Sequence, residues 1–411
     1  MNIIINFNLK KIMLFLVAMV VIFDFPPVVR QAQYCPAGNT VINIMVILFF
    51  YATAVYFFRT FQWSKQNILS CLFVGGYFIY RSVHTYYGQV QFYVTVFTML
   101  LIFEFLLLDA SNKVKVFHYF RKIMVVLLFF GILVYGMRMV LGTGLFEQVN
   151  FYSQNIAEHG YYYLRLCQFY ILEGGYVSRL CGPFNEPGVV GTFAALLLIA
   201  DQFDLRKKGN IVLLVAGVLS FSLAFFILCA GYIVLCAATE RRKDFLVIIL
   251  IVVILLVFLL PYLRSVSTVI DELAYRFTIT GDGLAGDNRT DDVYEAFFSS
   301  YMQTADRWLG LGTGAKDSLT RGANLSYKTL IIEYGIIGFA YLSLGLLFLP
   351  MVGKWKNRRC IYFVLLFLAS IYQRPNVMVL SYLVLLIGGT EYCFSRSVGL
   401  GSSRAGHTLA G

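Results

Sequence analysis

Apolar runs of roughly membrane-spanning length recur along nearly the whole chain of 411 residues, and this pattern constrains the fold most. Crossing a bilayer takes about 20 predominantly apolar residues. In lipid each backbone N–H and C=O needs an internal partner, so only helices or closed barrels can cross. Barrel strands alternate apolar and polar residues, whereas residues 245–260 are continuously apolar. The sequence therefore predicts an all-α integral membrane protein.

The charge content supports this prediction. Charged residues make up 13% of the chain, whereas a soluble domain carries about a quarter. We expect about twelve transmembrane helices and two large outer loops. The predicted spans are residues 12–25, 41–58, 67–84, 89–108, 123–141, 187–201, 210–222, 223–239, 245–262, 326–350, 360–372 and 377–393. Between Asn210 and Ala238, we expect a tight turn at Ser220 and Ser222.

The lysines indicate the orientation. If the N-terminus is cytoplasmic, eleven of the thirteen lysines lie in inner segments, and only Lys316 and Lys328 lie outside. This is the distribution that the positive-inside rule requires. Both termini are therefore predicted to be cytoplasmic. Because the same rule accounts for the net charge of +11, no nucleic-acid partner is expected.

The predicted organisation has six parts. They are N-terminal transmembrane helices (1–141), a first large outer loop (142–186), central transmembrane helices (187–262), a second large outer loop (263–325), C-terminal transmembrane helices (326–394) and a disordered cytoplasmic tail (395–411). Residues 151–172 are rich in Tyr and Phe with few charges, which favours a helix lying in the membrane interface. Cys167 and Cys181 share the first loop, and their spacing leaves a disulfide open. The cysteines show no zinc-type spacing, so no metal is expected.

Arginine follows a different distribution from lysine. Eleven of the twenty arginines fall on the outer side or at outer helix ends. Guanidinium groups bind phosphate and carboxylate oxygens in a bidentate manner. Each one alone could cap a helix or pair with an acid, but eleven together indicate an outward-facing anion site. They are Arg30, Arg81, Arg138, Arg165, Arg179, Arg264, Arg276, Arg289, Arg307, Arg321 and Arg374.

One motif precedes the sixth predicted span and reads Arg179-Leu-Cys-Gly-Pro-Phe-Asn-Glu186-Pro187-Gly188. Pro187 suits the first turn of a helix, where its missing N–H costs nothing. The free N–H groups and the dipole of that helix favour an anion. Arg179 could share this anion, and Glu186 could either neutralise Arg179 or act as a base. A plain capped helix entry is the alternative.

A second motif joins three glycine- and polar-rich pieces. They are Gly310-Leu-Gly312-Thr-Gly314-Ala-Lys316, Asn324-Leu-Ser-Tyr327-Lys328 and Glu333-Tyr-Gly335-Ile-Ile-Gly338. A nucleotide-binding P-loop is excluded because the spacing is not GxxxxGK[ST], no strand precedes it and the segment is predicted to lie away from cytosolic ATP. We expect instead a tight turn that lets the backbone approach a ligand.

Together these residues resemble the bacterial O-antigen polymerases (Wzy-type) of the O-antigen polymerase/ligase superfamily. The first motif is similar to their R-x-x-G-x-F-x-E-P pattern, and the second to the end of their large periplasmic loop and the following span. Asp287-Asn-Arg289 and Gln373-Arg374-Pro375 resemble further family features. The chain departs from the family at Ala323, where His often precedes the Asn, and at Ser222-Leu223, where Ser-Arg is common. A His-based role at position 323 is therefore not expected.

The resemblance implies a GT-C-like glycosyltransferase of the bacterial inner membrane. It would join undecaprenyl-diphosphate-linked oligosaccharides at the periplasmic face by inverting transfer, with no cofactor. The implied partners are donor and acceptor lipids, membrane lipids and a chain-length regulator protein. Cations must stabilise the leaving diphosphate, and a base must activate the acceptor hydroxyl. The predicted catalytic residues are the candidate bases Glu186 and Asp287 together with Arg179 and Arg289, and the predicted substrate-binding residues are Arg165, Arg276, Arg321, Asn324, Tyr327, Lys328 and Arg374.

Two other functions stay open. A ligase of the same superfamily would transfer finished glycan to lipid A core, and the missing His speaks mildly against it. A transporter or flippase of lipid-linked sugars is a different class. Transporters usually carry mid-span charges and an internal repeat, whereas Glu104 is one of few mid-span ionisable residues here and no repeat is visible.

Overall fold

The computed structural model of the chain describes twelve segments. They are residues 8–25, 27–31, 35–86, 92–149, 161–174, 177–240, 279–280, 283–284, 292–319, 326–372, 374–375 and 377–397. Of the predicted site residues, Arg276, Asp287, Arg289, Arg321 and Asn324 lie outside these segments, as does the predicted span 245–262.

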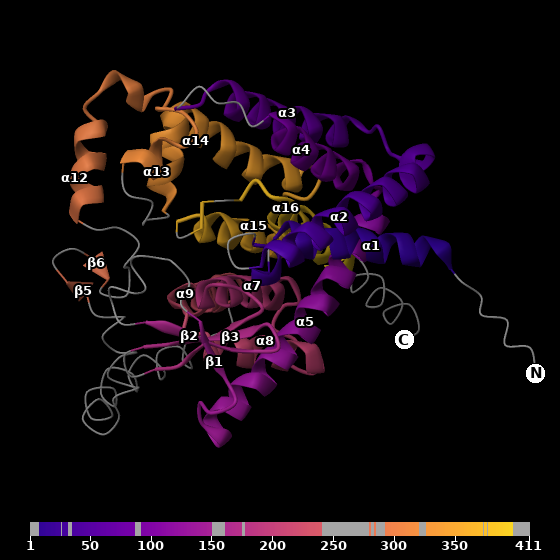
Figure 1. Ribbon diagram of the computed structural model, residues 1–411. Helices are drawn as coiled ribbons and strands as arrows, with labels where there is room; N and C mark the ends of the chain where they lie inside the picture. Colours follow the sequence, from indigo (N-terminus) through magenta and orange to yellow (C-terminus); the bar gives the residue numbers. More distant parts are fainter. Residues whose placement is uncertain are drawn as a thin grey trace, which may run out of the picture.

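The described residues form a bundle of helices with a small β-sheet packed beside it (Figure 1). The helices are α1 (Leu9–Asp24), α2 (Pro36–Phe57), α3 (Lys65–Val83), α4 (Phe92–Leu107), α5 (Ala110–Leu141), α7 (Pro187–Ala200), α8 (Lys208–Leu219), α9 (Leu223–Glu240), α12 (Asp292–Tyr301), α13 (Ala315–Leu319), α14 (Tyr327–Met351), α15 (Arg358–Ser370) and α16 (Leu380–Leu383). Short 3₁₀ turns lie at η1 (Val28–Arg30), η2 (Phe58–Thr60) and η3 (Ala305–Arg307), and the π-helical turn η4 (Val384–Gly388) continues α16.

Three helical stretches in the described part are long and apolar enough to cross a membrane. They are Pro36–Thr60, Ala110–Leu141 and Tyr327–Met351. In the first of them only 22% of the most apolar window is buried inside the protein, and Ile44, Leu48 and Tyr51 are exposed. Leaving this apolar surface in water would be unfavourable, whereas lipid removes it from water. The chain is therefore a helical membrane protein, as predicted.

A described helix overlaps each predicted span except 245–262. The largest difference is at α5, which begins at Ala110 rather than near residue 123. Asp109 explains the earlier start, because its side chain accepts a hydrogen bond from the backbone N of Asn112 at 2.7 Å. This N-cap extends the helix through a basic first part before the apolar part begins.

Helix α7 is the centre of the bundle, since all of its residues are buried. It packs against α8 and α9, which are separated by a tight turn as predicted. In that turn Phe221 adopts a left-handed conformation with φ 47°. The turn packs so closely on α7 that a Cβ on Gly191 would lie 2.3 Å from the Cβ of Ser222. Only glycine at position 191 allows this approach.

The first predicted outer loop contains a four-stranded antiparallel sheet. Its strands pair in the order β1 (Glu147–Val149), β2 (Tyr162–Leu166), β3 (Phe169–Glu173) and β4 (Arg179–Gly182). The prediction of an interfacial helix over residues 151–172 is therefore wrong for residues 162–172, which form the β2–β3 hairpin. Cross-strand pairs such as Tyr163 with Leu172 and Leu164 with Ile171 bury aromatic and branched side chains, which favours strands.

The two cysteines of this loop are free thiols, so the disulfide that the spacing left open is absent. Cys167 is exposed in the hairpin turn, whereas Cys181 is buried on β4. Burial raises the pKa of Cys181 to about 12. Its thiol is therefore protonated and unreactive at neutral pH.

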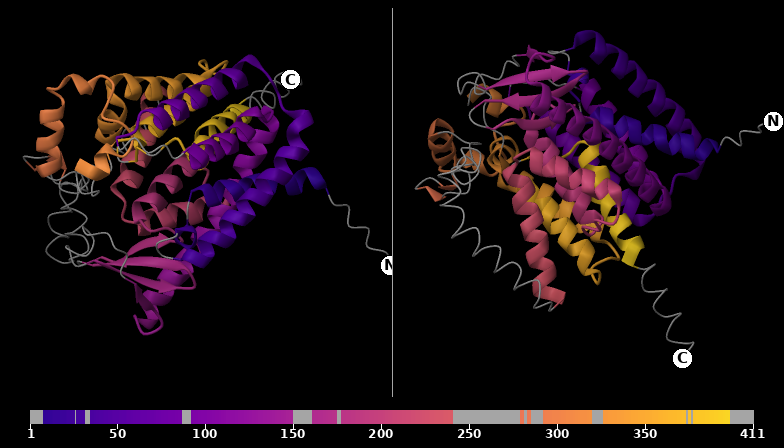
Figure 2. Two further views of the ribbon diagram at one scale, coloured as in Figure 1. Left: turned by 45° about the horizontal axis from the view of Figure 1, so that its top comes forward. Right: turned by 90° about the horizontal axis from the view of Figure 1, so that it is seen from below.

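The sheet and α12 lie toward the same end of the bundle in both views of Figure 2. Residues of the first and second predicted outer loops therefore share one end of the molecule. This is the arrangement expected if both loops lie on the same side of a membrane.

Candidate functional site at the start of α7

The candidate site is built on the first turn of α7. Pro187 is the first helical residue, and Glu186 precedes it in an extended conformation with φ −139° and ψ 134°. A proline at this position has no N–H to leave unsatisfied, and its fixed φ suits a helix. The positive end of the α7 dipole therefore points at Glu186 and its surroundings, where negative charge is stabilised.

An ion pair joins Glu186 to Arg374, which are 188 positions apart. The Nη2 of Arg374 donates to the Oε2 of Glu186 at 2.7 Å, and the two side chains are 11% and 32% exposed respectively. Arg374 follows α15, where its backbone N donates to the carbonyl of Ser370 at 3.0 Å. The structure thus brings together two residues that the sequence assigned separately to catalysis and to substrate binding.

The guanidinium of Arg374 has a hydrogen-bond donor for which the described residues provide no acceptor. This donor is its buried Nε. Burial lowers the pKa of Arg374, but the carboxylate of Glu186 raises it, and the pKa lies above the usual value. Arg374 is therefore a permanent cation with a buried N–H available for a further anionic oxygen.

Two tyrosines connect this pair to the start of α14. The backbone N of Tyr327 donates to the carbonyl of Tyr372 at 3.2 Å. Their rings stack with centroids 5.4 Å apart and an interplanar angle of 27°. Because Tyr372 is two residues before Arg374, predicted substrate-binding residues Tyr327 and Arg374 lie in neighbouring parts of one surface. Such flat aromatic faces suit sugar rings.

Lys328, the next residue of α14, is already paired. Its ammonium group donates to both carboxylate oxygens of Glu295 on α12 and lies 5.2 Å from the ring centroid of Phe298. Lys328 therefore joins α12 to α14. A ligand anion at Lys328 would have to share the ammonium group with Glu295.

Arg179, on β4, contacts the turn between α8 and α9. Its Nε donates to the carbonyl of Ser220 at 3.2 Å and its Nη2 to the carbonyl of Phe221 at 3.4 Å. These carbonyls follow the C-terminal end of α8, where a cation is favourable. This arginine therefore holds the α8–α9 turn against β4.

Arg165 is not brought into this group. It is opposite Glu147 in the β1–β2 ladder, and its guanidinium pairs with that carboxylate. Both side chains are partly exposed. Its carboxylate partner therefore lies on β1 and not at the start of α7, so the predicted contact of Arg165 with substrate has no support from the geometry.

The glycine motif packs against backbone of the same chain. Gly310, Gly312 and Gly335 all have positive φ. A Cβ on Gly310 would lie 2.4 Å from the carbonyl oxygen of Glu333, and one on Gly335 would lie 2.2 Å from that of Trp308. Backbone hydrogen bonds from Leu311 and Gly312 to the carbonyls of Ile332 and Glu333 close this contact. The predicted tight turn is confirmed, but the backbone it approaches belongs to a kink in α14.

We expect Gly335→Ala to destabilise the protein by at least about 2 kcal/mol, because alanine would be strained at φ 68° and would clash with Trp308. Thermal unfolding of the detergent-purified protein measures the change. The matched control is Gly136→Ala in α5, where a Cβ meets nothing within 4 Å. Equal melting temperatures for the two variants would contradict the packing role of Gly335.

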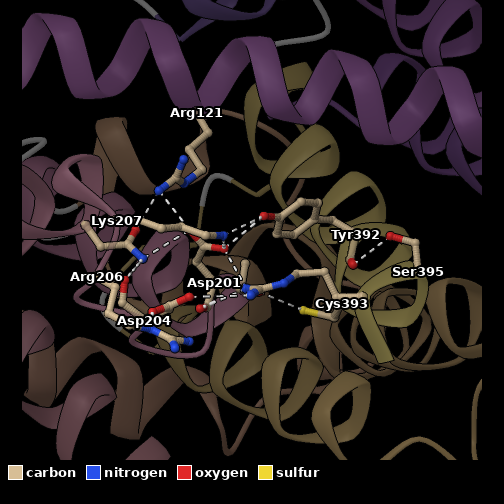
Figure 3. Close-up of polar contacts among 11 residues, drawn as sticks. Arg121, Asp201, Asp204, Arg206, Lys207, Tyr392, Cys393 and Ser395 are labelled. Carbon is tan, nitrogen blue, oxygen red and sulfur yellow. Dashed lines mark hydrogen bonds and ion pairs between the residues drawn. The ribbon is translucent and has the colours of Figure 1, made fainter. Parts of the chain in front are cut away.

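The sequence alone did not predict a second polar centre, at the opposite end of α7 (Figure 3). Asp201 is fully buried there and accepts bonds from Arg121 at 2.8 Å, Arg396 at 2.7 Å and Tyr392 at 2.8 Å. Lys207 and Asn210 also donate to its carboxylate. The basic run 206–208 after a predicted span was a weak signal for pairing, but it gave no indication of Arg121 or Arg396.

Comparison with protein-family models, curated proteins and solved structures gave no match for this chain. A buried arginine beside a helix N-terminus can hold a phosphate group. A carboxylate paired with that arginine can accept a proton once an anion competes for the guanidinium.

Proposed function

We propose that the chain is a polymerase that joins undecaprenyl-diphosphate-linked oligosaccharide repeats into O-antigen or a similar polysaccharide. The observation that carries the proposal is the Glu186–Arg374 pair at the N-terminal end of the fully buried α7. About twelve membrane spans, a GT-C-like arrangement, cytoplasmic termini and a site at the periplasmic face of the bacterial inner membrane belong to the same proposal.

In the proposed reaction, the donor diphosphate binds Arg374 and the first turn of α7. The phosphate oxygens compete with Glu186 for the guanidinium and occupy its unpaired Nε–H. Developing charge on the leaving diphosphate is stabilised by groups that are already in place. No metal or cofactor is part of this proposal.

Glu186, released from Arg374, then acts as the base. It takes the proton of the acceptor hydroxyl as that oxygen forms a bond to the anomeric carbon of the donor. The bond from this carbon to the diphosphate oxygen breaks, and undecaprenyl diphosphate leaves with the electron pair. Attack opposite to the leaving group inverts the anomeric centre.

The decisive test uses purified protein and synthetic lipid-linked repeats. We expect chain growth without cytosolic components, which a flippase or transporter cannot produce. Deleting the gene separates the polymerase from a ligase: loss of a polymerase leaves single repeats on the lipopolysaccharide, whereas loss of a ligase leaves bare core. Bare core after deletion of the gene, or no chain growth by folded purified protein, would overturn the proposal.

Arg179 offers a further prediction. Arg179→Ala removes two donors from the α8–α9 turn, so we expect a loss of about 1–2 kcal/mol in stability and shorter glycan chains. Thermal unfolding and the glycan ladder on a gel measure the two effects. An unchanged melting temperature would contradict the turn contact, and normal chain lengths would contradict the catalytic role that the sequence predicts for Arg179.

A further inference from the structure

We propose that a basic pocket between the ends of α9, α15 and the helical residues 389–397 that follow η4 binds the phosphate head group of an anionic phospholipid. The basic pocket is a cavity of about 550 Å³. Its polar lining includes Thr239, Lys354, Lys356, Arg358, Arg359 and Ser397. No acidic side chain is among the described residues that line it.

The charges in the pocket are only partly balanced. Lys354 is buried, and its Nζ lies 2.9 Å from the Oε1 of Glu391. Lys356 and Arg358 are exposed, and Arg359 is half-buried. Arg358 donates to the backbone carbonyl of Thr239 at 3.3 Å, which leaves its charge without a carboxylate in that contact. The pocket therefore carries surplus positive charge that an anion would neutralise.

Backbone geometry favours the same ligand. Asn357 caps α15 by accepting from the N atoms of Arg359 and Cys360 at 3.1 and 3.3 Å. The positive end of the α15 dipole therefore faces the pocket. The hydroxyl groups of Thr239 and Ser397 already donate to the carbonyls of Leu235 and Phe394, so the basic side chains are the donors to phosphate oxygens.

The position of Trp355 indicates where the pocket lies relative to a bilayer. This residue is between Lys354 and Lys356, just beyond the apolar stretch that ends at Met351. Trp355 is 46% exposed, and its ring packs against Phe348 at a centroid distance of 5.5 Å. Tryptophan favours the membrane–water interface. The pocket is therefore at the level of lipid phosphates, which favours a lipid head group over a soluble anion.

This site is separate from the proposed catalytic one. The pocket lies at the N-terminal end of α15, whereas Arg374 follows its C-terminal end. The thirteen residues of α15 span about 20 Å at about 1.5 Å per residue. Lipid binding can therefore be tested without reference to glycan synthesis.

The test measures lipid retained by the detergent-purified full chain in native mass spectrometry. We expect dioleoyl phosphatidylglycerol to bind in preference to dioleoyl phosphatidylcholine. Each basic side chain near a lipid surface is worth about fivefold in affinity, so Lys356→Gln/Arg359→Gln should weaken phosphatidylglycerol binding at least about tenfold. The single variant Lys356→Gln, which changes an exposed side chain, should weaken it about fivefold and keeps the test valid if the double variant misfolds.

The matched control is Lys65→Gln/Lys115→Gln, which removes two exposed lysines from helices outside the pocket. We expect this variant to bind phosphatidylglycerol like the unaltered protein. The proposed site would be wrong if the pocket variants bound phosphatidylglycerol as tightly as the unaltered protein. It would also be wrong if the control lost as much affinity as the pocket variants. Displacement of phosphatidylglycerol by glycerol 1-phosphate at comparable concentration would show a soluble-anion site and overturn the lipid assignment.

Discussion

Replacing Arg374 with alanine is expected to reduce chain growth by about 10²- to 10³-fold, the range seen when one preorganised donor to a developing anion is lost. The guanidinium is nearly buried, is fixed on Glu186 at 2.7 Å and has a buried Nε–H without an acceptor among the described residues. Arg374→Lys keeps the charge but loses the fork that binds two oxygens at once. We therefore expect the lysine variant to keep only a small part of the activity.

The measurement is the rate of chain growth by purified variants on synthetic lipid-linked repeats, normalised to folded protein. Glu186→Gln keeps an acceptor for Arg374 but cannot take a proton, so a base role predicts a loss of about 10²- to 10⁴-fold. The control is Arg206→Ala, whose side chain is 93% exposed and pairs with Asp204. Normal chain lengths in the Arg374→Ala and Glu186→Gln variants would contradict the roles of Arg374 in diphosphate binding and of Glu186 as the base.

The helices could be predicted from sequence because lipid leaves the backbone few alternatives. Apolar runs bounded by polar residues gave α7, α9 and α14 to within a residue or two. The start of α5 was missed because a single cap at Asp109 extends the helix into residues too polar for a span. An apolar run indicates where a helix crosses lipid, but it does not indicate where the helix continues beyond the span, as α5 does through the buried residues Lys113, Val116 and Phe117.

The small sheet could not be predicted for a different reason. Residues 162–172 are aromatic and apolar, a composition that fits an interfacial helix and a hairpin equally well. The turn between the strands is Cys167-Gln168, and both residues have positive φ. Asn-Gly or Asp-Gly would have indicated such a turn, whereas Cys-Gln carries no such signal. Pairing with β4 and packing on α5 decided the outcome.

The residue types at the candidate site could be predicted from the sequence, but the sequence did not show which of these residues pair with each other. Glu186 and Arg374 were both expected on the outer side, but no local pattern connects residues from different predicted loops. The glycine motif was expected to approach a ligand, but its glycines instead let the backbone of Gly310 approach Glu333 and that of Gly335 approach Trp308. Positive φ at a glycine indicates a close approach, and sequence does not say what approaches.

Asp201→Ala is expected to destabilise the protein by about 3–5 kcal/mol, the range for removing one partner of a buried ion pair. The side chain of Asp201 is fully buried and holds α5, the start of α8 and the helical residues 389–397 together through Arg121, Lys207 and Arg396. Without the carboxylate, Arg121, which is 9% exposed, keeps its charge inside the bundle with less compensation. Thermal unfolding in detergent and the amount of protein in the membrane measure the effect.

A double-mutant cycle separates the ion pair from general packing. If Arg121 and Asp201 stabilise each other, Arg121→Leu/Asp201→Ala should be less destabilised than the sum of the single variants, with a coupling of about 0.5–3 kcal/mol. The neighbour Asp204 provides the control, because its main partner Arg206 is in solvent and Asp204→Ala should change the melting temperature far less. Additive effects at Arg121 and Asp201 would show that burial alone, rather than their pairing, fixes this end of α7.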